Sequence, residues 1–587
     1  MRPTTVIAFS FAAALAAACS SGSDATDSSA DAVSGGPEEI ASPPNLGVSK
    51  LQHYGFERDH LSAASKKGLD TLFGGFGFHD AVPTRLKDLA AKLGAVKDAV
   101  DRRGKHVDAS TPDGEYEVYG KLPSPPGRDP KQGRTLGGSV FERNRVELAN
   151  LNCLSCHGGV VRGVVVAGLG NHDVDQVAQA YDANRLLSAR GALMTELNLN
   201  IFDSTRDAER KELTDFLSNT EGTIGPTFKF AKARGDNMGP YAVWKRISRL
   251  EDPQRAGLRE RAPDSPKTDE DRIFESLTLP TVDPNPWWTR RYKHTNYTWA
   301  ESSGYDKRAS WKAAATAVAA HFTLNFTTSH PEVNENHAAH VAAVRDILEF
   351  AEESTSPAFP GTLAGEKVQA GKEIFHGKGR CSGCHGTYEK STAFNKVGGW
   401  VVDYQDKFLD VGTDTKVWDV VDRLRPMADR SNLMKNFPAF STGDLAPQFI
   451  YPSARGYAVP VLVGTWASAP YFHNGSVPTL YGVLNSKARP KIWARPHNNA
   501  YAYSLVRVGI EYQERTAEEY ASMAKVAAAS DPISEESLKF RALYNTTEYG
   551  RSNAGHTFGD NLTDAERFAV IEFLKSISGG DLVNKNK

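Results

Sequence analysis

Two copies of one short pattern constrain this chain more than any other feature of its sequence. The pattern is Cys-x-x-Cys-His, and it occupies residues 153–157 and again residues 381–385. The chain has 587 residues and only five cysteines, so the two copies account for four of the five. Any fold for this chain must therefore present two thiols and a histidine at one fixed short spacing, twice.

Paired cysteines serve three kinds of chemistry. A zinc ribbon joins two C-x-x-C units only ~15–20 residues apart, whereas Cys381 follows Cys156 by 225 residues. A redox-active thiol pair needs no histidine after it. Attachment of a c-type haem needs all three side chains, because the thiols bond to the haem and the histidine becomes the proximal iron ligand. We therefore expect two covalently attached c-type haems, anchored by Cys153, Cys156, Cys381 and Cys384, with His157 and His385 as proximal iron ligands.

The N-terminus has the pattern of an export signal. Arg2 is followed by an apolar run at 6–18 that is too short to cross a bilayer, and small residues precede Cys19. We expect residues 1–19 to be a signal peptide of the lipoprotein type with Cys19 lipidated; simple cleavage, with the cysteine discarded, is the alternative. Residues 20–48 are rich in Ser, Ala, Asp and Gly and predict a flexible tether. The folded body would then be exported, to the periplasm, the outer membrane, the cell surface or the medium, and would touch a membrane only through the lipid.

The composition is that of a soluble globular protein with more than one domain. The chain has 69 Lys and Arg against 71 Asp and Glu, so it lacks the excess of basic residues that is typical of proteins that bind nucleic acid. Each motif predicts one cytochrome c-type lobe, which gives an N-terminal haem domain at 49–358 and a C-terminal haem domain at 359–587. Both exceed a minimal cytochrome, so we expect a mainly α fold enlarged by long loops and a few short hairpins.

Two helices of the C-terminal lobe are predicted in some detail. The stretch leading into the second motif has an apolar, close-packing face, formed by Val368, Ala370, Gly371, Ile374 and Phe375. Near the C-terminus, Thr563 and Glu566 form a capping-box pattern. Apolar residues at helical spacing follow it, and Gly579 can end the helix. One helix before the motif and one closing helix after it are what a cytochrome c lobe needs.

Longer stretches resemble a known family. Two C-x-x-C-H lobes in one exported chain resemble the bacterial di-haem cytochrome c peroxidase superfamily. Within it, "GTWASAPYFHNGSVPTLYGVL" (464–484) resembles a loop of the rubber oxygenases and their relatives. "SNAGHTFGDNLTDAE" (552–566) resembles the segment that carries the sixth ligand of the second haem in that branch. "GLGNHDVD" and "DPNPWWTRRYK" fit the same branch, and the likeness covers both lobes through these motifs.

The resemblance implies a haem-dependent dioxygenase. Dioxygen would be activated at the N-terminal haem, on His157, which needs an open or weakly occupied sixth position. The substrate would be apolar with carbon–carbon double bonds, either polyisoprene or an unsaturated fatty acid, and a redox partner protein is an open expectation. The second haem would serve as an electron reserve. The alternatives are a hydrogen peroxide-reducing peroxidase, a peroxide-dependent relative that oxidises a protein, and a non-catalytic di-haem electron carrier.

The sixth ligand of the second haem is implied by the same resemblance. It points to His556, which would close that haem together with His385. Met427 and Met434 are the competing ligands, since a thioether raises the potential of a haem. His473 is expected to form hydrogen bonds near the propionates of the second haem or the backbone around it.

Several residues are expected around the first haem. One of Trp287 and Trp288 is expected to bridge the two haems, with core packing as the alternative, and Trp299 is expected to line the distal pocket. His172 follows His157 by 15 residues and could either contact the first iron or stay away from it. The apolar stretch 160–170 after the first motif predicts core, and would also suit an apolar pocket.

Overall fold

The structure is a computed structural model. It describes residues 41–75, 81–86, 111–198, 204–249, 266–292, 297–298, 303–305, 337–390, 400–405, 407–431, 449–450, 455–496, 499–579 and 582–584. The signal segment, Cys19 and most of the expected tether lie outside these residues. The described chain contacts the rest of the fold from its start, because the Ser42 hydroxyl donates a 3.0 Å hydrogen bond to the Tyr503 carbonyl.

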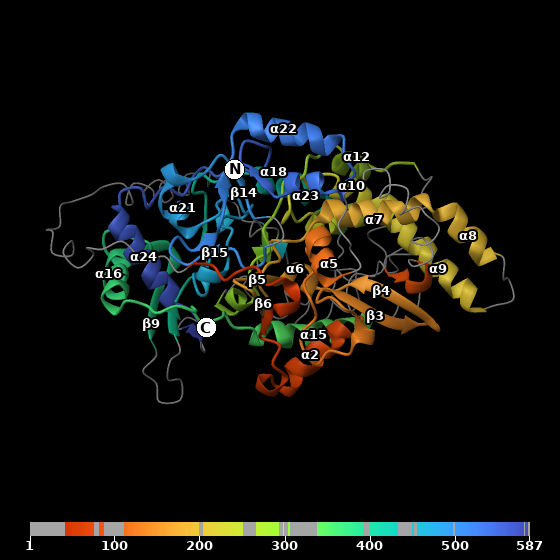
Figure 1. Cartoon of the computed structure of the whole chain (residues 1–587), viewed down its shortest axis with the longest axis horizontal. Coiled ribbons are helices and arrows are strands. Elements are labelled where there is room, and N and C mark those ends of the chain that lie inside the picture. Colours follow the sequence, from red (N-terminus) through yellow and green to blue (C-terminus); the bar gives the residue numbers. More distant parts are fainter. Residues whose placement is uncertain are drawn as a thin grey trace, which may run out of the picture.

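The elements of the first half gather around the first motif. Its helices are α2 (Ala63–Phe73), α5 (Pro112–Tyr119), α6 (Leu154–His157), α7 (Gln176–Ser188), α8 (Arg190–Asn198), α9 (Ser204–Asn219), α10 (Gly225–Phe228), α11 (Gly239–Ser248), α12 (Asp269–Glu275), the 3-10 helix η6 (Trp287–Tyr292) and α15 (His337–Glu353). Its main strands are β1 (Gln52–Tyr54), β2 (Val82–Pro83), β3 (Gly138–Arg143), β4 (Val146–Leu151), β5 (Gly158–Val161) and β6 (Val164–Ala167). They occupy the centre and the right side of Figure 1.

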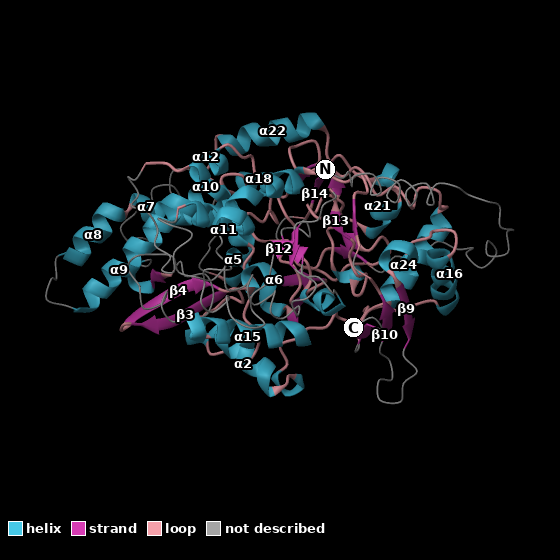
Figure 2. Ribbon diagram, turned by 180° about the vertical axis from the view of Figure 1, so that it is seen from behind, coloured by secondary structure: helices cyan, strands magenta, loops and turns pink. Residues whose placement is uncertain are grey.

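The second half is built around two helices that pack side by side at the left of Figure 1, α16 (Gly365–His376) and α24 (Asp564–Ser576). The other helices include α17 (Ser382–His385), α18 (Lys416–Ser431), α21 (Leu480–Leu484), α22 (Ala517–Ala528) and α23 (Glu535–Arg541). The strands include β9 (Thr387–Lys390), β10 (Trp400–Asp403), β13 (Tyr457–Ala458), β14 (Ile492–Ala494) and β18 (Leu543–Asn545). Figure 2 shows that the described fold is mainly helical with short strands, of which the β3–β4 hairpin is the longest pair.

The prediction for the two C-terminal helices is confirmed. Thr563 and Glu566 form both hydrogen bonds of a capping box at the start of α24. These bonds give partners to backbone N–H groups that have none within the first turn of a helix. Four of the residues expected on the packing face of α16 are buried, namely Ala370, Gly371, Ile374 and Phe375. Helix α24 ends at Ser576, and Gly579 follows in the left-handed region.

The hydrophobic cores cross from one half to the other. The largest core cluster unites the second half with Val161, Val166, Leu169 and Trp288 of the first. A second cluster, around α2 and α15, takes Tyr501 from the second half. Helices α2 and α15 lie side by side in both views and cover Trp287. The packing therefore fixes the two haem motifs relative to each other.

No described helix has both the length and the apolar character needed to cross a membrane.

The contact between α16 and α24 gives a direct test of this packing. A Cβ at Gly371 would lie 1.9 Å from the Ala569 carbonyl oxygen, so Gly371→Ala must push the two helices apart. We expect a loss of about 1–3 kcal/mol in unfolding free energy from this overpacking, measured by urea denaturation of the haem-loaded protein. Gly365→Ala, in the same helix with nothing within 4 Å, is the control and should cost nothing. Equal unfolding midpoints for the two variants would contradict the packing.

Candidate haem sites

Both Cys-x-x-Cys-His motifs fold into the same one-turn helix. In each, the first cysteine is the N-cap in a right-handed helical conformation, and the turn ends at the histidine. The His157 amide donates to the Cys153 carbonyl at 3.0 Å, and the His385 amide donates to the Cys381 carbonyl at 2.9 Å. None of these four cysteines forms a disulfide bond. The chain thus presents two thiols and an imidazole from one turn at each motif, as attachment of a c-type haem requires.

Two buried asparagines hold the first turn. Asn152, the residue before the N-cap, accepts a 2.9 Å hydrogen bond from the Leu154 amide and so holds the start of the turn. Asn171 donates from its side chain to the Ser155 and Gly120 carbonyls, at 3.0 and 3.1 Å, and its backbone amide donates to the Cys156 carbonyl. The first motif is therefore fixed by side chains that precede and follow it.

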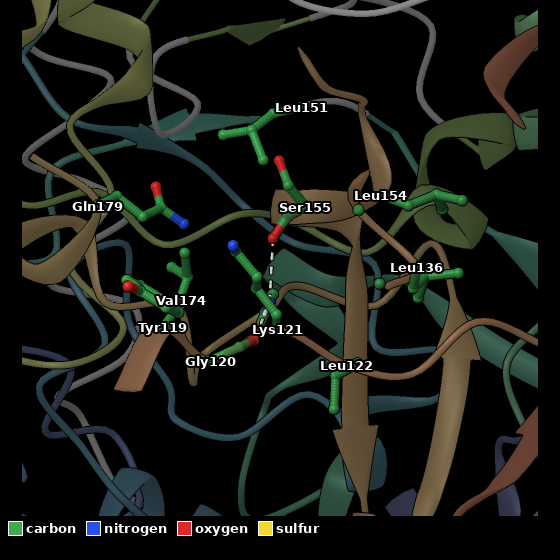
Figure 3. A pocket seen from close by; sticks show the side chains of 13 residues that line it. Tyr119, Gly120, Lys121, Leu122, Leu136, Leu151, Leu154, Ser155, Val174 and Gln179 are labelled. Carbon is green, nitrogen blue, oxygen red and sulfur yellow. Dashed lines mark hydrogen bonds between the residues drawn. The ribbon is translucent and has the colours of Figure 1, made fainter. Parts of the chain in front are cut away.

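A small pocket lies behind this turn. It encloses about 280 Å³, including space open to solvent, and Figure 3 shows Lys121 and Gln179 around it together with Ser155 of the motif. The dashed lines there are the two hydrogen bonds that reach Ser155 and Gly120. A volume this small falls below that of ordinary ligand sites, so the pocket serves the packing of the turn.

His385, the histidine of the second motif, has a fixed ring orientation. Its Nδ1 lies 2.9 Å from the Pro460 carbonyl oxygen. A carbonyl only accepts, so Nδ1 carries the proton and Nε2 is left for a metal, the arrangement typical of metal-bound histidines. Burial lowers the pKa of His385, which favours the neutral form that binds metals. The turn is held further by the Tyr388 hydroxyl, which donates to the His385 carbonyl at 2.7 Å.

His556 lies opposite His385. The two ring centroids are 6.3 Å apart and the planes are inclined by 63°. The His556 backbone has a φ of 47°, a left-handed conformation that costs about 1–3 kcal/mol in a residue with a side chain. Its Nδ1 is buried and has no hydrogen-bond partner among the described residues. Burial and the nearby charges of His385 and Arg489 lower the pKa of His556 to about 4, so the ring is neutral at physiological pH.

The spacing of these two rings fits one iron between them. Two axial imidazoles have centroids about 6–6.5 Å apart, given ~2.0 Å for each metal–nitrogen bond and ~1.2 Å from nitrogen to ring centre. The observed 6.3 Å agrees with this value. Phe472 and Phe558 stand beside the His556 ring, with centroids 6.1 and 5.3 Å away, and make its surroundings apolar. The described residues contain no group of three or more His, Cys, Asp or Glu placed to hold a bare metal ion.

The structure separates the two tryptophans between the motifs. The Trp287 ring lies against His157, with centroids 5.3 Å apart and planes inclined by 31°. Trp288 is fully buried in the core of the second half, and its indole N–H donates to the Val463 carbonyl at 3.0 Å. Consecutive residues thus contact the first proximal histidine and the loop that follows Pro460.

His172 and His473 are both held close to Asp283. The Nδ1 of His172 lies 2.9 Å from an Asp283 carboxylate oxygen, and the Asp283 amide donates to the His473 carbonyl at 2.8 Å. The His473 ring stacks on Tyr457 with centroids 3.9 Å apart. Burial lowers the pKa of His473 to about 3, and its Nε2 has no hydrogen-bond partner among the described residues.

Three expected site residues fall where the structure gives no side-chain position. Trp299 and Met434 lie outside the described residues, and Met427 lies on α18 in a part whose side chains are not described. The structure brings together His385 and His556, and it brings Trp287 to His157.

Sequence reasoning missed three contributors to the sites. Pro460 supplies its carbonyl to His385 from 75 residues away, Asn152 bonds to the start of the first turn, and Arg489 bonds to the segment that carries His556. The asparagine directly before the first cysteine was a readable signal, because asparagine side chains commonly bond to the backbone amide two residues on. The carbonyl of Pro460 left no such signal, because any residue has one.

Comparison with known proteins agrees with this location. A family model described as "RoxA-like, cytochrome c-like" matches residues 456–494, a stretch that contains Pro460, Phe472, His473 and Arg489. The uncharacterized protein y4iM of Sinorhizobium fredii (strain NBRC 101917 / NGR234) is 47% identical over 58 residues, which is 10% of this chain. The match spans only 13% of that relative's length. Residues 456–494 are therefore similar to part of a RoxA-like cytochrome c domain, and a cytochrome c-like domain implies a c-type haem with its iron.

The number of haems can be measured directly. We expect the intact protein to carry the mass of two haems and Cys153→Ala with Cys156→Ala to carry one, because each turn supplies its own pair of thiols. The pyridine haemochrome spectrum gives the same count independently. Cys381→Ala with Cys384→Ala is the matched control and should also leave one haem. A wild-type mass with a single haem would rule out the two-site assignment.

Proposed function

We propose that the protein is an exported di-haem c-type oxygenase. The haem on His157 would be the site of reaction, and the haem on His385 would be an electron reserve closed by His556. The substrate would be apolar with carbon–carbon double bonds, either polyisoprene or an unsaturated fatty acid. The facing pair of His385 and His556 carries this proposal, since a second haem closed on both sides leaves the chemistry to the first.

Closure of the second haem suits storage of an electron. An iron between two imidazoles is low-spin and has a lower potential than one with a methionine ligand, and a fixed ligand set changes little between oxidation states. Phe472 and Phe558 give the His556 ring apolar neighbours on that side. His473, with its buried and unpartnered Nε2, would donate a hydrogen bond to a propionate of this haem.

The surroundings of His157 suit a reactive site. The hairpin β5–β6 begins directly after His157 and is mostly buried, so it would give a haem on His157 an apolar surrounding. His172, the histidine nearest in sequence after the motif, contacts Asp283 through its Nδ1. A bound c-type haem supplies the redox chemistry with oxygen; the protein provides access, polarity and axial ligation.

Electrons would pass between the haems through the tryptophan pair. Trp287 contacts the ring of His157, and the indole of Trp288 bonds to Val463, three residues after Pro460. Pro460 in turn bonds to the ring of His385. This sequence of contacts joins His157 to His385; Trp287 and Trp288 are both buried, and the contact between Pro460 and His385 is exposed.

Export is part of the proposal and rests on the N-terminal sequence. A lipid on Cys19 would hold the folded body at a membrane through the tether, in the periplasm or at the outer membrane. A redox partner protein would refill the electron reserve.

The reaction is tested by oxygen uptake. We expect the purified protein to consume dioxygen with linoleate or polyisoprene as substrate and without added peroxide, followed with an oxygen electrode and by mass spectrometry of the products. Stearate, the saturated analogue of linoleate, is the matched control and should give no uptake. Turnover that requires hydrogen peroxide and oxidises a cytochrome or protein donor would point to a peroxidase, and no turnover with either oxidant would point to an electron carrier.

The ligand of the second haem is tested by spectroscopy. His556→Ala should convert one of the two haems to high-spin, because its iron loses an imidazole, and the electron paramagnetic resonance spectrum of the oxidised protein should lose a low-spin signal. Met427→Ala and Met434→Ala are the controls and should keep that signal. If one of these methionine variants loses it while His556→Ala does not, the assignment of His556 is wrong.

A further inference from the structure

Arg489 forms an unusually complete set of hydrogen bonds close to the second haem site. It lies between α21 and β14, and its guanidinium donates to five backbone carbonyls. These belong to Gly482 (2.8 Å), Val483 (3.3 Å), Asn553 (2.7 Å), Gly555 (2.6 Å) and His556 (3.0 Å). A guanidinium has five N–H donors, so the number of these hydrogen bonds equals the number of donors that Arg489 has.

The five carbonyls come from two separate segments. Two belong to α21, which is buried and fixed by a Thr479 cap. Three belong to the turn at 553–556 that ends in His556. Arg489 therefore ties this turn to a rigid element of the C-terminal lobe, and no side chain of the turn takes part in the contact.

The turn needs such support, because it holds two consecutive residues in a left-handed conformation. Gly555 has a φ of 79° and His556 a φ of 47°. Glycine tolerates this conformation and histidine does not favour it. The facing residue Phe472 is left-handed as well, with a φ of 70°, and its ring lies 5.0 Å from the Arg489 guanidinium carbon. One side chain thus contacts both residues whose backbones are strained at this site.

We infer that Arg489 is the positioning residue that keeps His556 within bonding distance of the second iron. This inference rests on the proposed role of His556 as a ligand, and adds what holds that ligand in place. Without the guanidinium, the turn can relax toward an ordinary backbone conformation and carry the imidazole away from His385. The second haem would then open to external ligands although His556 itself is unchanged.

Arg567 provides a matched control within the same lobe. It is also a buried arginine, and its guanidinium donates to the Leu484, Gly559 and Asp560 carbonyls. The first of these carbonyls is at the end of α21 and the other two are in the loop after His556. None of them belongs to the turn at 553–556. Arg567→Lys therefore disturbs the same region of the fold without releasing the ligand turn.

The test compares Arg489→Lys, Arg489→Gln, Arg567→Lys and His556→Ala as haem-loaded proteins. Lysine keeps the charge and loses the fork, so both Arg489 variants should bind cyanide at the second haem at least tenfold faster than wild type and lose part of its low-spin signal. Arg567→Lys should match wild type in both readings, even where its urea midpoint falls as far as that of Arg489→Lys. If Arg489→Lys does not fold, Arg489→Gln takes its place in the comparison.

The outcomes separate the two proposals. If the Arg489 variants keep the low-spin signal and the cyanide-binding rate of the wild type while His556→Ala changes both, the positioning role of Arg489 is wrong and the assignment of His556 stands. An unaltered His556→Ala would overturn the ligand assignment and the role of Arg489 with it. Equal changes in Arg567→Lys and Arg489→Lys would show a general loss of packing, and would also overturn the positioning role.

Discussion

The hydrogen bond between the His385 ring and the Pro460 carbonyl sets the geometry on which the second site depends. It fixes the proton on Nδ1, leaves Nε2 for the iron of the proposed second haem, and places the ring opposite His556, 6.3 Å away between centroids. The segment that supplies this carbonyl continues to Val463, whose carbonyl accepts a hydrogen bond from the indole N–H of Trp288. A single loop therefore orients the histidine of the second motif and contacts the element that leads to the histidine of the first.

The two halves of the chain share their cores, and this sharing gives the pair of sites its fixed arrangement. Trp287 packs with α2 and α15 in the first half, while Trp288 is buried among residues of the second. Neither half can shift without exposing a large aromatic side chain, and aromatic residues dominate the energetics of such contacts. In the proposed di-haem protein, two haems held this rigidly would suit transfer of electrons within one molecule.

Local patterns of the sequence predicted the parts of the fold that depend on local chemistry. The capping box of Thr563, the packing face around Gly371 and the separation of the chain into two motif turns could all be read from residue type and spacing. The contacts that backbone atoms make between residues far apart in the sequence could not be predicted in this way. Pro460 and the carbonyls bound by Arg489 act through backbone atoms, which leave no trace in residue identity. The resemblance implied that one of Trp287 and Trp288 bridges the two haems, but it did not predict that the Trp287 ring lies against His157, because sequence does not fix which way each ring turns.

The central claim is that one haem of the pair is open and the other is closed by two imidazoles. Titration of the fully reduced protein with carbon monoxide measures this most directly, since the gas binds only to an iron with a free or weakly held sixth position. The account predicts one carbon monoxide bound per chain, with two haems present by mass. Binding of two molecules, or of none, would contradict it.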